Sequence, residues 1–180
     1  EVLSGLIGRW AKDLLGKEEK DRQGGDTYWG GKSMLKTCQA FNMAWQLQLP
    51  IAKDLYAEAR RITADWLTHE PEEKAFYYAR YPLPWSGLVG FNPSYGSEQF
   101  TDNHFHYGYL AMSVALIGMH DPVWLAKYGP SAREVVKQYG EWERGSKRYP
   151  RLRTFECWAG HSYAGGMSSG YDGNNQESSS

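Results

Sequence analysis

The sequence contains little cysteine: only Cys38 and Cys157 among 180 residues. Two cysteines are too few for the disulfide framework of a small secreted domain, and their spacing does not show whether they meet. We therefore expect two buried free thiols. Neither cysteine lies in a motif that would activate a nucleophilic thiolate, so cysteine-based catalysis is not expected.

An excess of charge of one sign and long apolar runs are also missing. The chain has 20 Lys and Arg against 21 Asp and Glu, a net charge of −1, which provides no basic field to attract nucleic acid or anionic lipid. No apolar run approaches the roughly 18 residues of a membrane span. No glycine-rich phosphate loop follows a predicted strand. Nucleic acid and membranes are therefore not expected partners.

Aromatic residues, in contrast, are abundant. They make up 15% of the chain, with 8 Trp and 13 Tyr, and many stand beside Gly, Asn, His or Asp. Flat aromatic faces stack on the C–H faces of sugars, but they also supply bulk to a helical core. Composition alone leaves both uses open.

The two ends of the sequence indicate a fragment. The chain opens on Glu1 without the charged and apolar segments of a signal peptide, and it stops at Ser180 inside a predicted helix start. We interpret residues 1–180 as part of a single domain that is truncated at both ends. A missing signal peptide then carries no information on localisation.

Apolar residues recur at helical spacing along most of the chain, so we predict a mainly α protein. Residues 75–95 mix aromatics with Gly and Pro, which predicts short strands or irregular structure. Helix hairpins with long connections are typical of an α/α toroid or barrel, whose active site lies in a cleft at one end. The predicted helices are Val2–Leu15, Lys32–Leu47, Ile51–Thr68, Asp102–Met119, Val123–Lys127 and Ser131–Glu143.

Residues 101–109 concentrate groups that can do chemistry, with Asp102, His104 and His106 among three aromatic residues. If a helix begins near Asp102, His106 stands four residues later and shares its face. A general acid needs a raised pKa, from burial or a second carboxylate, whereas a helix N-terminus favours the ionised form. Aspartate is also a preferred N-cap, so a purely structural Asp102 is the competing interpretation.

Two later segments carry polar groups that suit sugar hydroxyls. Glycines flank His161 and let a ligand approach the backbone. Residues 174–177 read Asn-Asn-Gln-Glu, and amides both donate and accept hydrogen bonds, although a solvated loop with Asx-turns is the alternative. Asp102 and Glu177 together supply the two carboxyls that most glycosidases use.

A zinc site is the other chemistry that these residues permit. His104, His106 and His161 could ligate zinc together with Asp102 and Glu177. His104 and His106 are two residues apart and point to different faces of a helix, which makes joint ligation awkward. We expect no metal and no organic cofactor.

Three motifs resemble glycoside hydrolase family 81, the inverting endo-β-1,3-glucanases. They are Asp-Asn-His-Phe-His-Tyr-Gly-Tyr at 102–109, Gly-His-Ser-Tyr-Ala at 160–164, and Asp-Gly-Asn-Asn-Gln-Glu-Ser-Ser-Ser at 172–180. Asp-Thr-Tyr-Trp-Gly-Gly-Lys at 26–32 matches upstream. The sequence departs from the family at Tyr163, where Trp is common, and at Cys157, where acidic or small residues are common.

The resemblance implies a central part of an (α/α)6 barrel from a secreted, monomeric enzyme that hydrolyses β-1,3-glucan. It places the general acid at Asp102, with His106 near it in the cleft. The family has two glutamates four residues apart; the first falls on Glu177, and the second, as general base, would follow Ser180, so we expect the chain alone to be inactive. The substrate-binding residues that we expect are Tyr107, Trp158, His161, Tyr163, Asp172 and Asn175.

Two other functions stay open at this point. A carbohydrate-binding helical domain without catalysis would use the same aromatics and amides. Another polysaccharide-degrading toroid enzyme, a hydrolase or a lyase, would share the architecture, and a lyase would release unsaturated sugars.

Overall fold

The computed structural model describes residues 1–69, 71, 77–80, 87–90, 92–100, 102–153, 155–158 and 161–162. This part of the chain is mainly helical, as predicted. The helices are α1 (Val2–Leu15), α2 (Trp29–Gln46), α3 (Ala52–Asp65), α4 (Asn103–Gly118) and α5 (Pro122–Gly140), with short 3-10 turns η1 (Glu19–Asp21) and η2 (Ser97–Gln99). The strands are β1 (Tyr78–Arg80), β2 (Leu88–Gly90), β3 (Phe155–Glu156) and β4 (His161–Ser162).

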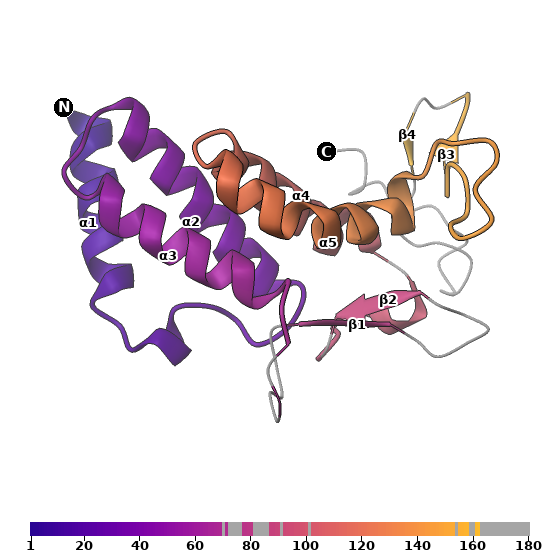
Figure 1. Ribbon diagram of the computed structural model, residues 1–180. Coiled ribbons are helices and arrows are strands. Elements are labelled where there is room, and N and C mark those ends of the chain that lie inside the picture. Colours follow the sequence, from indigo (N-terminus) through magenta and orange to yellow (C-terminus); the bar gives the residue numbers. More distant parts are fainter. Residues whose placement is uncertain are drawn as a thin grey trace.

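The helices form two hairpins that pack side by side (Figure 1). α2 packs against both α3 and α4, α4 packs against α5, and α1 covers the outer side of α2. Short connections join α2 to α3 and α4 to α5, which makes each pair antiparallel. Hairpins of this kind agree with the predicted toroid, and the closed (α/α)6 barrel stays a prediction from the resemblance.

The core lies where the hairpins meet. Met34, Cys38 and Phe41 recur at helical spacing on α2 and are fully buried between α3 and α4. Burial of the Met34 and Phe41 side chains contributes roughly 1.5–3 kcal/mol each by removing them from water. Facing them are further side chains with at most 1% of their surface exposed: Leu55, Ile62, Trp66, Leu110 and Ile117.

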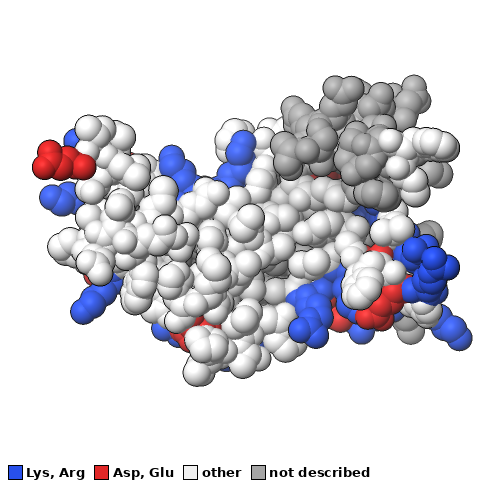
Figure 2. Space-filling view, turned by 90° about the horizontal axis from the view of Figure 1, so that it is seen from above, with Lys and Arg blue, Asp and Glu red and all other residues white. Residues whose placement is uncertain are grey.

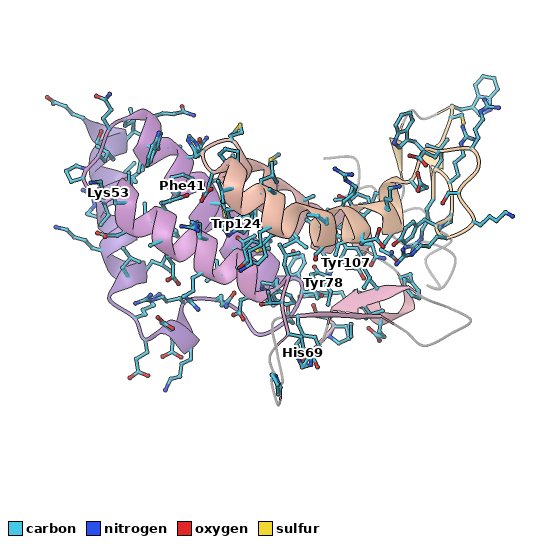
Figure 3. The ribbon with its side chains drawn as sticks, viewed as in Figure 1. Phe41, Lys53, His69, Tyr78, Tyr107 and Trp124 are labelled. Carbon is cyan, nitrogen blue, oxygen red and sulfur yellow. The ribbon has the colours of Figure 1, made fainter. Side chains whose placement is uncertain are left out.

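A small antiparallel hairpin, β1–β2, lies against the ends of α4 and α5, inside the segment predicted to hold short strands (Figure 1). The Leu88 amide donates to Gln138 Oε1 at 3.0 Å, and Tyr107 Oη donates to the Leu88 carbonyl at 2.6 Å. Figure 3 shows Tyr78 next to Tyr107, and their ring centroids are 5.2 Å apart. The hairpin is thus fixed to both helices.

Two predictions about these elements were wrong. Residues 122–140 form one helix, not two, although Pro130 lies inside it. Trp124 and Val135, on either side of Pro130, are buried, so tertiary packing outweighs the local penalty of proline. Of the two thiols, Cys38 is buried as expected, with its pKa raised to about 11 by burial, but Cys157 is exposed.

Charged side chains are sparse on the face seen from above, and most of them lie toward its ends (Figure 2). The middle of this face, over the helices, is largely uncharged. Among the described residues, no helix is both long and apolar enough to cross a membrane.

The proline inside α5 gives a test of this helix. Proline removes one helical hydrogen bond and crowds the preceding turn, so Pro130→Ala should raise the free energy of unfolding by about 1–3 kcal/mol. Thermal unfolding followed by circular dichroism measures this gain. Pro122→Ala is the matched control, because proline suits the first helical turn, and it should not stabilise the chain. Equal effects of the two changes would contradict an unbroken α5.

Candidate functional site

The site is built at the start of α4, where the backbone is strained. Asn92, Tyr95, Phe100 and Asp102 all have positive φ angles, at 57°, 53°, 63° and 53°. Non-glycine residues in this region cost on the order of 1–3 kcal/mol each and gather at functional sites. Four of them within residues 92–102 mark this approach to α4 as a segment held by its surroundings.

Asp102 occupies the N-cap position of α4, but its carboxylate does not cap the helix. Instead, its backbone carbonyl accepts hydrogen bonds from the amides of Phe105, at 3.0 Å, and His106, at 3.1 Å. The interpretation of Asp102 as a simple capping side chain is therefore wrong. Asp102 as a whole is half-buried at this position.

His106 lies one turn after Asp102, as the helical spacing predicted, and only 1% of it is exposed. Its Nδ1 is 2.6 Å from Thr27 Oγ1, which in turn is 3.3 Å from Ser97 Oγ. Burial lowers the pKa of His106 to about 4, against a smaller opposite effect of Asp26. The imidazole is therefore neutral near pH 7, and its Nε2 is a buried atom without a hydrogen-bond partner in this structure.

The turn before α2 supplies the partner of His106. Asp26 Oδ1 accepts hydrogen bonds from the amides of Tyr28, at 2.8 Å, and Trp29, at 2.6 Å, and so starts α2 three residues before the predicted Lys32. This tight turn places Thr27 against α4. Residues 26–32 were recognised in the sequence as a motif, but no role was predicted for Thr27. Its place inside that motif was the feature that could have pointed to it.

His104 and His106 face different neighbours. The His104 ring lies 5.1 Å from that of Tyr139 on α5, whereas the His106 ring lies 5.5 Å from that of Tyr28. Burial also lowers the pKa of His104 to about 4. Within the described ranges, no three His, Cys, Asp or Glu side chains come together as a metal site would require.

The predicted substrate-binding residues are placed unevenly. Tyr107 has no exposed surface and packs inside the fold with its hydroxyl on Leu88, so its expected contact with substrate is set aside. Trp158 is 99% exposed after β3, and His161 begins β4, paired with Glu156. Tyr163, Asp172, Asn175 and Glu177 lie outside the described residues.

Comparisons with known proteins agree with the resemblance. Residues 6–180 match the Glycosyl hydrolase family 81 C-terminal domain. The chain is similar to a glucan endo-1,3-beta-D-glucosidase of Acetivibrio thermocellus, 40% identical over 161 residues, which are 86% of this chain and 20% of that protein. It is also similar to one of Thermobifida fusca, 35% identical over 160 residues, with 86% and 21% covered.

A solved structure agrees as well. It is that of a mutant of a glycoside hydrolase family 81 protein from Clostridium thermocellum, and it matches with a TM-score of 0.77 at 33% identity. The match covers 91% of this chain and 23% of that chain. The chain thus spans about a fifth of the length of its relatives.

Gly90 of β2 tests how Thr27 is held. A Cβ at this position would lie 1.9 Å from Thr27 Cγ2, so Gly90→Ala must shift either the Thr27 side chain or β2. We expect a loss of about 1–3 kcal/mol of unfolding free energy in thermal unfolding. Gly108→Ala on α4 is the control, because no described atom lies within 4 Å of its added Cβ.

The double variant Gly90→Ala/Thr27→Ser sharpens this test. Serine lacks Cγ2 but keeps the hydroxyl that faces His106, so it should restore most of the lost stability. If it restores none, contact between Gly90 and Thr27 does not explain the loss.

The buried histidine also predicts a pH dependence. Its folded pKa of about 4 lies below the ordinary value of 6.5, so the unfolded chain binds the proton first as pH falls. Stability should be fully present above about pH 6.5 and should fall toward pH 4, by up to about 3 kcal/mol for His106. His106→Gln removes this titration and should make the fall in that window shallower, leaving the part that His104 contributes. An unchanged slope in chemical unfolding would contradict the buried neutral ring.

Proposed function

The chain belongs to glycoside hydrolase family 81, and from this premise we propose that it contributes the general acid to an enzyme that hydrolyses internal linkages of β-1,3-glucan. The resemblance at residues 102–109 and the names of the relatives support this activity. The chain matches only about a fifth of the length of these relatives, so we propose the activity for the natural full-length protein. We further propose that this protein is secreted, monomeric and independent of cofactors.

In the proposed reaction, Asp102 donates its proton to the glycosidic oxygen while the bond from that oxygen to the anomeric carbon breaks. A glutamate removes a proton from water, and the water oxygen bonds to the anomeric carbon from the opposite face. Bond breaking and bond making on opposite faces invert the configuration. The two carboxyls then stand about 6.5–9.5 Å apart, which leaves room for the water.

The observation that carries the assignment of Asp102 is its position at the N-cap without a capping side chain. A strained backbone and a buried histidine one turn later fix its place on α4. The glutamate is proposed from the run at 174–180: either Glu177 or the residue after Ser180 is the base. His106 is proposed to position the start of α4, because a buried ring that is neutral near pH 7 lacks the acidic imidazolium proton of a general acid.

Sugar contacts are proposed on the C-terminal side of the chain. Trp158, with its ring exposed, offers a stacking face. His161, Tyr163, Asp172 and Asn175 are proposed to contact hydroxyls or to shape the subsites, with amide and hydroxyl groups that both donate and accept hydrogen bonds.

Replacing the acid tests the function. Asp102→Asn keeps the size of the side chain but cannot donate the carboxylic proton, so kcat on laminarin should fall about 10²–10⁴-fold in the natural full-length protein. Release of reducing sugar measures the rate. Asp13→Asn on α1, an exposed aspartate paired with Lys17, is the matched control and should leave the rate unchanged.

Two results would count against the proposal. Undiminished hydrolysis by the Asp102→Asn variant would remove Asp102 as the acid. Binding of β-1,3-oligosaccharides by the wild-type protein without any cleavage would favour a non-catalytic carbohydrate-binding protein.

A further inference from the structure

Several aromatic side chains meet where α2 begins, beside the start of α4. Tyr28 is their centre: its ring centroid lies 5.1 Å from that of Trp29, 4.9 Å from that of Tyr95 and 6.0 Å from that of Tyr109. Lys32, one turn later on α2, places its Nζ 3.0 Å from Tyr28 Oη. We call these five residues the Tyr28 cluster.

The cluster is not part of the core. Trp29 is 53% exposed and Tyr95 is 61% exposed, although both are large aromatics. Exposed apolar groups that lie together, with polar groups at their edge, mark binding sites more often than single exposed aromatics do. The cluster therefore offers aromatic edges and faces to a molecule in solution.

The polar groups at the edge of the Tyr28 cluster can donate hydrogen bonds. Lys32 Nζ lies 4.6 Å from the centre of the Tyr28 ring and 5.4 Å from that of Trp29. The hydrogen bond to Tyr28 raises the pKa of Lys32, so the ammonium stays charged at neutral pH. Ammonium and phenol groups beside aromatic faces suit a ligand with hydroxyls on its rim and C–H groups on its faces.

Several backbone features hold the cluster in place. Tyr95 has a positive φ of 53°, and Asn92 Nδ2 donates to the Gly25 carbonyl at 2.5 Å, which ties residues 92–96 to the turn before α2. Gly31 lets the Tyr109 ring lie on α2, because a Cβ there would be 2.8 Å from Tyr109 Cδ2. The surface is thus arranged before a ligand arrives, which reduces the entropy lost on binding.

The cluster continues the face of α4 that carries the proposed acid. The Tyr28 ring lies 5.5 Å from the His106 ring, and Asp102, His106 and Tyr109 follow each other at helical spacing. From Asp102 to Tyr109 the helix rises about 10 Å, a distance that a short oligosaccharide can span.

We propose that Trp29 and Tyr95 form a glucan-binding subsite. In it, a sugar ring away from the cleaved bond stacks on aromatic faces and forms hydrogen bonds with Lys32 and Tyr28. This inference rests on the proposed function for the class of sugar, a β-1,3-glucan. The subsite adds binding energy from a part of the substrate that does not react.

The test uses the natural full-length protein with laminarin as substrate. Trp29→Ala and Tyr95→Ala should each raise KM about 3- to 10-fold, as expected for one lost aromatic contact, with kcat nearly unchanged. Trp29→Phe keeps an aromatic face and should recover part of the loss. Lys32→Met should raise KM by a smaller factor.

The matched control lies on the same helix. Trp45 is 46% exposed, close to the value for Trp29, but it stands sixteen residues later, about 24 Å along α2. It contacts Phe41, Tyr56 and His120 instead of the Tyr28 cluster. Trp45→Ala should leave KM for laminarin unchanged.

The outcomes separate the subsite from the function on which it rests. If the wild-type protein cleaves laminarin but Trp29→Ala and Tyr95→Ala keep its KM, the subsite is wrong and the proposed function stands. A lowered melting temperature with unchanged KM would show that these rings pack against protein, and it also overturns the subsite. If the wild-type protein neither binds nor cleaves β-1,3-glucan, the proposed function fails first and the subsite fails with it.

Discussion

The contact between Thr27 and His106 holds the site together. Its 2.6 Å distance joins the turn before α2 to the first turn of α4, and Ser97 extends the link to η2. Gly90 of β2 lies so close that Thr27 leaves no room for a Cβ there. The turn before α2, β2, η2 and α4 therefore meet at the Thr27 side chain, with His106 and Ser97 at its hydroxyl and Gly90 at its methyl group.

This arrangement explains why a strained backbone persists. The positive φ angles of Phe100 and Asp102 are unfavourable in isolation, and a Phe side chain has no polar atom with which to stabilise this backbone conformation as an Asp side chain can. The links from Thr27 to His106 and from Asn92 to Gly25 hold both ends of the strained segment. Strain and support together place Asp102 at the N-cap without using its side chain.

Most of the helices could be predicted from the sequence because their apolar residues repeat at the helical period. α1 follows the predicted Val2–Leu15, and α4 differs from its prediction by one residue at each end. The prediction for α5 was wrong because it rested on the local rule that proline breaks a helix. That rule does not include the burial of Trp124 and Val135. The exposure of Cys157 and the burial of Tyr107 likewise depend on tertiary packing, which composition does not reveal.

In the site, too, some features could be predicted from the local sequence and others depend on tertiary contacts. Spacing predicted that Asp102 and His106 share a helix face, because His106 follows Asp102 by four residues, whereas the role expected of Asp102 came from the resemblance. Thr27 could not be found from spacing, because it meets His106 across 79 positions of sequence through a turn that Asp26 sets. The neutrality of His106 near pH 7 follows from its burial. A charged imidazolium one turn from a carboxyl would stabilise the ionised carboxylate. A neutral ring does not, so it does not oppose the protonated form that a general acid needs. The burial of His106 therefore suits the role proposed for Asp102.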